Sequence, residues 1–163
     1  MGEIKLNGKL TRTSGSLPEV GSIAPDATVT TTELADVTLS SFPGKRILNI
    51  FPSLDTPVCA ASVRIFAKEA TQQPGVTVLN VSMDLPFAQK RFAALEGLER
   101  VHLLSAFRSD FPTRFGLRIE EGGMRGLCSR AVIVLDEANR VLYTEQVPEI
   151  AQEPDYDAAL ASV

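Results

Sequence analysis

The chain has 163 residues, of which 44% are hydrophobic and 22% are charged, and its formal net charge is -4. These proportions are typical of a globular protein with a buried core and exclude a disordered chain or a membrane protein. Because the charge is slightly negative and no basic run is present, we expect neither nucleic acid nor an anionic membrane surface as a partner. We expect one domain over residues 1–163.

The N-terminal residues predict a β-hairpin. Two strand-like segments within residues 3–13 flank Asn7-Gly8, the strongest two-residue signal for a hairpin turn. We assign residues 1–14 to this hairpin. A connection marked by Gly and Pro follows it, and residues 27–31 predict one short strand.

The central part of the chain alternates between strand patterns and helix patterns. Residues 46–51 and 76–81 have the composition of buried strands, and residues 58–72 between them carry apolar side chains at helical spacing. This pattern predicts a βαβ unit with parallel strands. A helix over residues 86–95 and a short strand over residues 101–104 are expected next.

The C-terminal part predicts an antiparallel hairpin and a helix. Residues 131–135 and 141–145 form the hairpin around a turn at residues 137–139, and residues 155–160 form the helix. A parallel βαβ unit followed by a hairpin and a terminal helix is the arrangement of a thioredoxin-like α/β fold. We expect that fold with the N-terminal hairpin added to it.

The chain has two cysteines, Cys59 and Cys128, which are too few for a disulfide scaffold. The first ten residues contain no apolar segment of the kind that secretory signals have. We therefore expect a cytoplasmic protein, whose thiols stay reduced unless they take part in redox chemistry.

Cys59 lies between a buried strand and the start of a helix, where open α/β sheets place their chemistry. Unpaired N–H groups and the helix dipole favour a thiolate in the first helical turn. The hydroxyl of Thr56, three residues earlier, can face the sulfur, and Pro52 offers a rigid wall. The simpler roles are a small buried residue for Cys59, a helix cap for Thr56 and a loop residue for Pro52.

Pro52, Thr56 and Cys59 match the Pro-x-x-x-Thr-x-x-Cys signature of the peroxiredoxins, and the chain resembles the bacterial thiol peroxidase subfamily. The resemblance covers nearly the whole chain and includes NIFPSLDTPVCAASVR, SMDLPFAQKRF, LERVHLLSAFR, SRAVIVLDE and EPDYDAAL. It implies a homodimer that reduces hydrogen peroxide or organic hydroperoxides without metal, haem or flavin, and that thioredoxin recycles.

The resemblance also implies roles for individual residues. The Cys59 thiolate would attack the distal peroxide oxygen and become a sulfenic acid, while Thr56 would hydrogen-bond the peroxide. Arg130 matches the active-site arginine of the subfamily and would stabilise the developing charge. Without the resemblance, Arg130 is equally well interpreted as a surface cation at the start of a strand.

The chain departs from the subfamily at Ala93, where most members carry the resolving cysteine. Three interpretations remain open: a natural one-cysteine enzyme that an external thiol reduces, an engineered replacement, or a disulfide between Cys59 and Cys128. The third follows if Cys128 and Arg130 share one face of an extended strand. Otherwise Cys128 is a small thiol without a redox role.

Two other classes of function are kept as alternatives. One is a thioredoxin-fold redox sensor or binding module, in which Cys59 is oxidised without turnover. The other is a cysteine hydrolase that uses His102, the only histidine. No group of His, Cys, Asp and Glu has the spacing of metal ligands.

Overall fold

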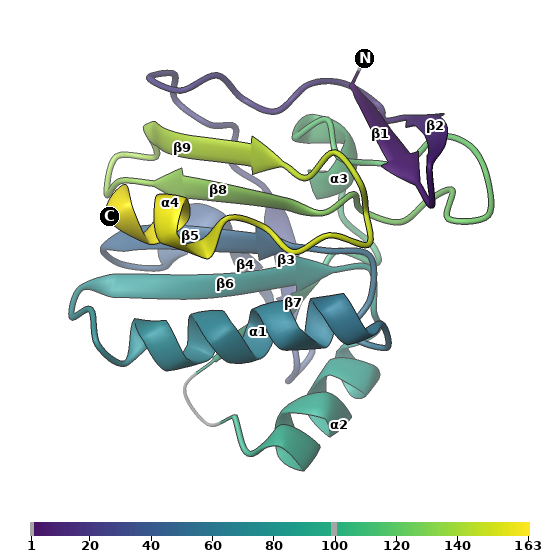
Figure 1. Cartoon of the computed structure of the whole chain (residues 1–163). Helices are drawn as coiled ribbons and strands as arrows, with labels where there is room; N and C mark the ends of the chain where they lie inside the picture. The colour runs from purple at the N-terminus through teal and green to yellow at the C-terminus, as the bar shows by residue number, and fades with distance from the viewer. Residues whose placement is uncertain (1, 99–100) are drawn as a thin grey trace.

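A seven-stranded mixed β-sheet forms the centre of the computed structural model, which describes residues 2–98 and 101–163 (Figure 1). The strand order is β4-β3-β7-β6-β5-β8-β9. Neighbours β5, β6 and β7 run parallel to one another, and the other neighbouring pairs are antiparallel. The strands are β3 (Thr28–Thr31), β4 (Asp36–Thr38), β5 (Lys45–Ile50), β6 (Val76–Ser82), β7 (His102–Ser105), β8 (Ala131–Leu135) and β9 (Val141–Gln146).

Two helices connect the three parallel strands. α1 (Pro57–Ala70) follows β5, and α2 (Pro86–Glu96) follows β6. Each helix has a proline in its first turn, where the fixed φ angle suits the helix and a missing N–H costs nothing. Because parallel strands end at the same edge of a sheet, the loops that lead into α1 and α2 meet at that edge.

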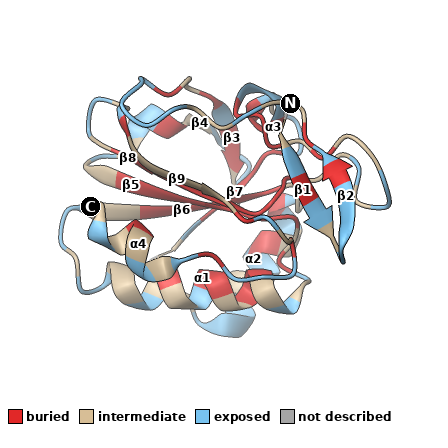
Figure 2. Ribbon diagram, turned by 45° about the horizontal axis from the view of Figure 1, so that its top comes forward, coloured by how far each residue is buried: buried red, intermediate tan, exposed pale blue. Residues whose placement is uncertain are grey.

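The side chains of the sheet alternate between two packed layers. In β8, Val132 and Val134 pack with α1 and with the C-terminal helix α4 (Tyr156–Ala161). Ala131, Ile133 and Leu135 point to the opposite face, where they pack with residues of α3 (Phe111–Arg114). Figure 2 shows that the central strands are buried along most of their length between these layers.

The predicted thioredoxin-like α/β fold and its N-terminal hairpin are both confirmed. The hairpin consists of β1 (Glu3–Leu6) and β2 (Lys9–Arg12), and its turn residues Asn7 and Gly8 have φ angles of 51° and 83°. Positive φ at both central residues is what a type I′ turn requires. The other predicted elements occur close to their predicted bounds.

Three elements are absent from the sequence prediction. They are β4, a 3-10 helix at Leu39–Ser41, and α3, each of which has three or four residues. Segments this short carry no periodic pattern of apolar residues. Within the described part of the chain, no helix combines the length and the apolar character needed to cross a bilayer.

Gly44→Ala should lower the free energy of unfolding by more than Gly75→Ala does. Gly44 has a φ angle of +74°, and a Cβ there would overlap the carbonyl oxygen of Gly75 at the start of the β5–β6 pair. Gly75 has a φ angle of +84°, but a Cβ there meets nothing within 4 Å. The control variant therefore carries only left-handed strain, roughly 1–2 kcal/mol. If Gly44→Ala and Gly75→Ala lose the same free energy of unfolding in urea, the close approach of Gly44 to the Gly75 carbonyl would be contradicted.

Candidate active site

Cys59 is buried in the first turn of α1. Its exposed fraction is 0%, and it packs in a cluster with Phe51, Leu54, Val63 and Leu103. No acidic side chain lies in this turn. Within this turn no carboxylate competes for the unpaired N–H groups and the positive end of the helix dipole, an arrangement that attracts a negatively charged group.

The loop between β5 and α1 brings Pro52 and Thr56 to the same end of the helix. Pro52 is buried and Thr56 is partly buried. Thr56 occupies the N-cap position with an extended backbone, but its side chain makes no capping hydrogen bond. Its hydroxyl instead donates to the carbonyl oxygen of Ser53 at 3.1 Å. The simple interpretation of Thr56 as a side-chain cap is therefore wrong.

Arg130 lies directly before β8 and is only 3% exposed. Its Nε donates to the carbonyl oxygen of Ile150 at 2.9 Å, whereas its Nη1 is buried without a hydrogen-bond partner. The alternative that Arg130 is a surface cation is therefore wrong. A buried guanidinium nitrogen without a partner is costly, and it remains free to donate to an incoming oxygen.

Tyr156 links Arg130 electrostatically to Cys59. Burial, followed by the Glu153 carboxylate, raises the pKa of Tyr156, while the charge of Arg130 lowers this pKa and the charge of Cys59 raises it. The Tyr156 hydroxyl donates to Glu153 at 3.1 Å, and its ring packs edge-on against Phe66 of α1 at 5.2 Å. Arg130 and Cys59 therefore both lie within electrostatic range of one phenol.

Ala93, at the usual position of the resolving cysteine, lies on α2 and packs against the cluster that contains Cys59. The position is therefore close to the candidate site, but its methyl group cannot form a disulfide. α2 is continuous through this residue.

Cys128 lies in the other hydrophobic layer. It is fully buried in the cluster that contains Ala131 and Ile133, and both cysteines are free thiols. β8 begins only at Ala131, and Cys128 instead forms an isolated bridge with Arg118. The strand alternation expected to place Cys128 and Arg130 on one face therefore does not extend to Cys128.

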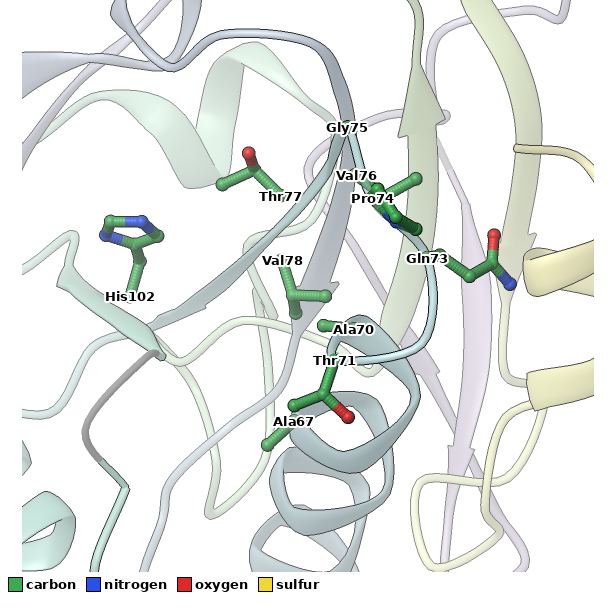
Figure 3. Close-up of a pocket in the computed structure, with 10 residues that line it drawn as sticks. All are labelled: Ala67, Ala70, Thr71, Gln73, Pro74, Gly75, Val76, Thr77, Val78 and His102. Atoms are coloured by element: carbon green, nitrogen blue, oxygen red, sulfur yellow. The ribbon is translucent and has the colours of Figure 1, made fainter.

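His102 is exposed at the start of β7, with its ring 4.8 Å from that of Phe42. It lines a hollow of about 400 Å³ together with Ala67 and Ala70 from the C-terminal half of α1 (Figure 3). Ala67 is eight residues beyond Cys59, or about 12 Å along the helix axis. The pairing of Cys59 with a histidine base that a hydrolase needs is therefore not assembled.

Sequence reasoning did not single out Asp84 or Tyr156. Asp84 lies two residues beyond the end of β6 and accepts hydrogen bonds from Ser53 and Leu54 in the loop before α1. A carboxylate at the end of a parallel strand is a signal that could have been found. Tyr156 gives no such signal, because its approach to the site depends on how α4 packs. Among the described residues, no group of three or more His, Cys, Asp and Glu could hold a metal ion.

The comparison with known families gives the class of the protein. The redoxin family profile matches residues 19–160. A peroxiredoxin-like protein from Aquifex aeolicus has a similar structure, with a TM-score of 0.92 and 36% sequence identity, over 98% of this chain and 94% of that one. The chain belongs to the redoxin family.

Similar curated sequences define its place within that family. The thiol peroxidase of Mycobacterium tuberculosis is 52% identical, and that of Corynebacterium glutamicum is 48% identical. Both alignments cover 100% of this chain and 99% of the relative. Within the redoxins the chain is thus one of the thiol peroxidases.

Cys128 should make stability depend on pH above pH 9. Burial, with a smaller contribution from the Asp84 carboxylate, raises the pKa of the Cys128 thiol from 9.0 to about 12. Because the pKa is higher in the folded state, the protonated Cys128 thiol contributes fully to the free energy of unfolding below pH 9. This contribution is lost as the pH rises towards 12.

The test is urea unfolding of the wild type and of Cys128→Ala between pH 8 and pH 11. For each pH unit above 9, the free energy of unfolding of the wild type should fall by roughly 1 kcal/mol more than that of the variant. Parallel curves for the two proteins would contradict the assignment of a buried, protonated thiol.

Proposed function

We propose that this thiol peroxidase reduces hydroperoxides with Cys59 as the nucleophile. The observation that carries the proposal is the position of this buried thiol in the acid-free first turn of α1, packed against Phe51 and Leu54 of the segment that leads into the helix. A helix N-terminus and a guanidinium favour the thiolate, which is the reactive form of cysteine. Hydrogen peroxide and small organic hydroperoxides are the proposed substrates.

The reaction breaks the O–O bond of the hydroperoxide. The sulfur of Cys59 donates an electron pair to the distal oxygen, and the other oxygen leaves as hydroxide or alkoxide and takes up a proton. Sulfur is oxidised to a sulfenic acid while the peroxide is reduced to water or an alcohol. Negative charge moves from sulfur to the leaving oxygen, so hydrogen-bond donors along that path lower the barrier.

Arg130 and Thr56 are the proposed donors along that path. The Nη1 group of Arg130 is buried and unpaired, and the Ile150 carbonyl fixes the guanidinium through Nε. A donor held in place before the substrate arrives needs no reorganisation during the reaction. The Thr56 hydroxyl can accept a hydrogen bond from the peroxide O–H while it donates to the Ser53 carbonyl, or donate to the peroxide once it leaves that carbonyl. Pro52 limits the access of water from the loop side.

We further propose that an external thiol returns Cys59 to the reduced state. Ala93 offers no sulfur, and Cys128 lies in the opposite layer with a pKa raised to about 12, so its thiolate is scarce at neutral pH. One external thiol forms a mixed disulfide with release of water, and a second thiol then releases Cys59. Thioredoxin, whose two thiols supply both steps, is the proposed donor in a reducing cytoplasm.

A homodimer is the proposed assembly. Leu85 and Phe87 at the start of α2 are 51% and 67% exposed, and Phe107 after β7 is also partly exposed. Apolar side chains exposed in this way are the kind that protein–protein contacts cover.

Cys59→Ser should abolish peroxide consumption, whereas Cys128→Ser should retain at least half of it. The reason is that Cys59 lies at the N-terminus of a helix, whereas burial raises the pKa of the Cys128 thiol to about 12. The measurement is steady-state consumption of hydrogen peroxide with dithiothreitol as reductant. Full activity of Cys59→Ser would contradict the proposal, and a single oxidation of the wild type without turnover would indicate a redox sensor.

Arg130→Met should lower the second-order rate constant for Cys59 oxidation about 100-fold, as expected when one donor to developing negative charge is removed. Stopped-flow mixing with hydrogen peroxide measures this constant. Arg118→Met is the control, because Arg118 forms an ion pair with Glu120 and is substantially exposed. A similar loss in both variants would show that the effect is not specific to Arg130.

A further inference from the structure

The carboxylate of Asp84 joins the two loops at the carboxyl edge of the parallel strands. It lies between β6 and α2, and it accepts three hydrogen bonds. Ser53 Oγ donates to Oδ1 at 2.7 Å, and the Leu54 N–H and Ser82 Oγ donate to Oδ2 at 2.8 Å and 2.6 Å. Hydrogen bonds to an ionised carboxylate are about twice as strong as neutral ones, so this is a firm attachment of the loop before α1.

Ser53, which is bonded to Asp84, is in turn hydrogen-bonded to Thr56. The carbonyl oxygen of Ser53 accepts hydrogen bonds from both the backbone N–H and the hydroxyl of Thr56, at 3.2 Å and 3.1 Å. Ser53 Oγ also accepts the Asp55 N–H at 3.1 Å. The side chain of Ser53 is thus held by Asp84, and its backbone holds the Thr56 side chain.

Asp84 is itself held from the neighbouring strand. The Ser105 hydroxyl of β7 donates to the Asp84 carbonyl oxygen. Gln89 of α2 donates to Ser82 Oγ at 3.3 Å and to the Leu104 carbonyl oxygen at 2.9 Å. Besides the loop, the carboxylate is thus bonded directly to Ser82 of β6, while β7 holds the backbone of Asp84 and α2 holds the Ser82 hydroxyl.

We propose that Asp84 and Ser53 are positioning residues that set the orientation of the Thr56 hydroxyl at the N-terminus of the helix that carries Cys59. The inference rests on the proposed peroxidase function and extends it to residues outside the Pro-x-x-x-Thr-x-x-Cys signature. Neither side chain needs to touch the peroxide. Their effect reaches the reaction through Thr56, so it exists only while the Thr56 hydroxyl is present.

This dependence gives a test by double-mutant cycle in a Cys128→Ser background, where Cys59 is the single thiol. Ser53→Ala and Asp84→Asn should each lower the rate constant with hydrogen peroxide about tenfold, since small misplacements of a hydrogen-bonding catalytic group have effects of this order or larger. In the presence of Thr56→Val, neither substitution should cause a further loss. Alkylation of Cys59 by iodoacetamide, which does not need a hydrogen bond to the Thr56 hydroxyl, should change by less than about twofold.

Asp136→Asn is the matched control. The Asp136 carboxylate also organises a turn, because it accepts the N–H groups of Ala138 and Arg140 at 2.8 Å each, but that turn joins β8 to β9. This variant should keep the wild-type rate constant. If Asp84→Asn does not fold, Ser53→Ala, which removes a single hydroxyl, decides the test alone.

Two results would overturn the inference. One is an unchanged peroxide rate constant in Ser53→Ala, and the other is a loss that multiplies with that of Thr56→Val, since the residues would then act independently. Failure of the proposed peroxidase function would give a different result from these two. In that case the protein without these substitutions is alkylated normally but does not react with peroxide.

Discussion

A buried sulfur at the start of a helix is the feature on which the rest of the site depends. Burial disfavours a charged thiolate, so the charge must be compensated by donors already in place. Cys59 is fully buried in the first turn of α1, where backbone N–H groups have no intrahelical partner, and we propose that the buried guanidinium of Arg130 supplies the remaining donor. The proposed peroxide reaction at Cys59 would therefore need both sets of donors to be held rigidly.

The fold supplies this rigidity from elements that are far apart in sequence. A buried polar network ties the first turn of α1 to the sheet, since Ser62 donates to the Cys59 carbonyl oxygen at 2.8 Å and receives a hydrogen bond from Asn49 of β5 at 3.2 Å. The C-terminal segment reaches Arg130 through the Ile150 carbonyl. The edge of the parallel strands is thus the meeting point of at least four segments.

Much of this arrangement could be predicted from the sequence. Buried strand runs and helical spacing predict the βαβ unit, and the place of Cys59 between strand and helix predicts a thiol with access to a helix N-terminus. The position of Cys128 could not be predicted from its separation of two residues from Arg130. Side chains alternate between the two faces only within a strand, and β8 starts at Ala131. The burial of Arg130 and the hydrogen bonds from Ser53 and Leu54 to Asp84 depend on long-range packing, which leaves no periodic pattern in the sequence.

The absence of a sulfur at Ala93 changes what the site must do after oxidation. In a protein that forms an internal disulfide, two cysteines have to meet, and local structure must open for them. Here α2 is an unbroken helix. Glu96, the last residue of α2, forms an ion pair with Arg64 of α1, with an N–O distance of 2.6 Å. Exposed pairs of this kind contribute little individually, but nothing in this arrangement needs to open for an internal partner. An external thiol needs access to the oxidised sulfur, and because Cys59 is fully buried here, the residues that cover it must move to admit that thiol.

The most direct test of the account is the intact mass of the reduced protein after one equivalent of hydrogen peroxide, under non-reducing conditions and beside Cys128→Ser. The account predicts the gain of a single oxygen, located on Cys59, in both proteins. A loss of two hydrogens in the wild type that disappears in Cys128→Ser would mean a disulfide between Cys59 and Cys128, and would contradict the conclusion that Cys59 works as the single redox-active thiol.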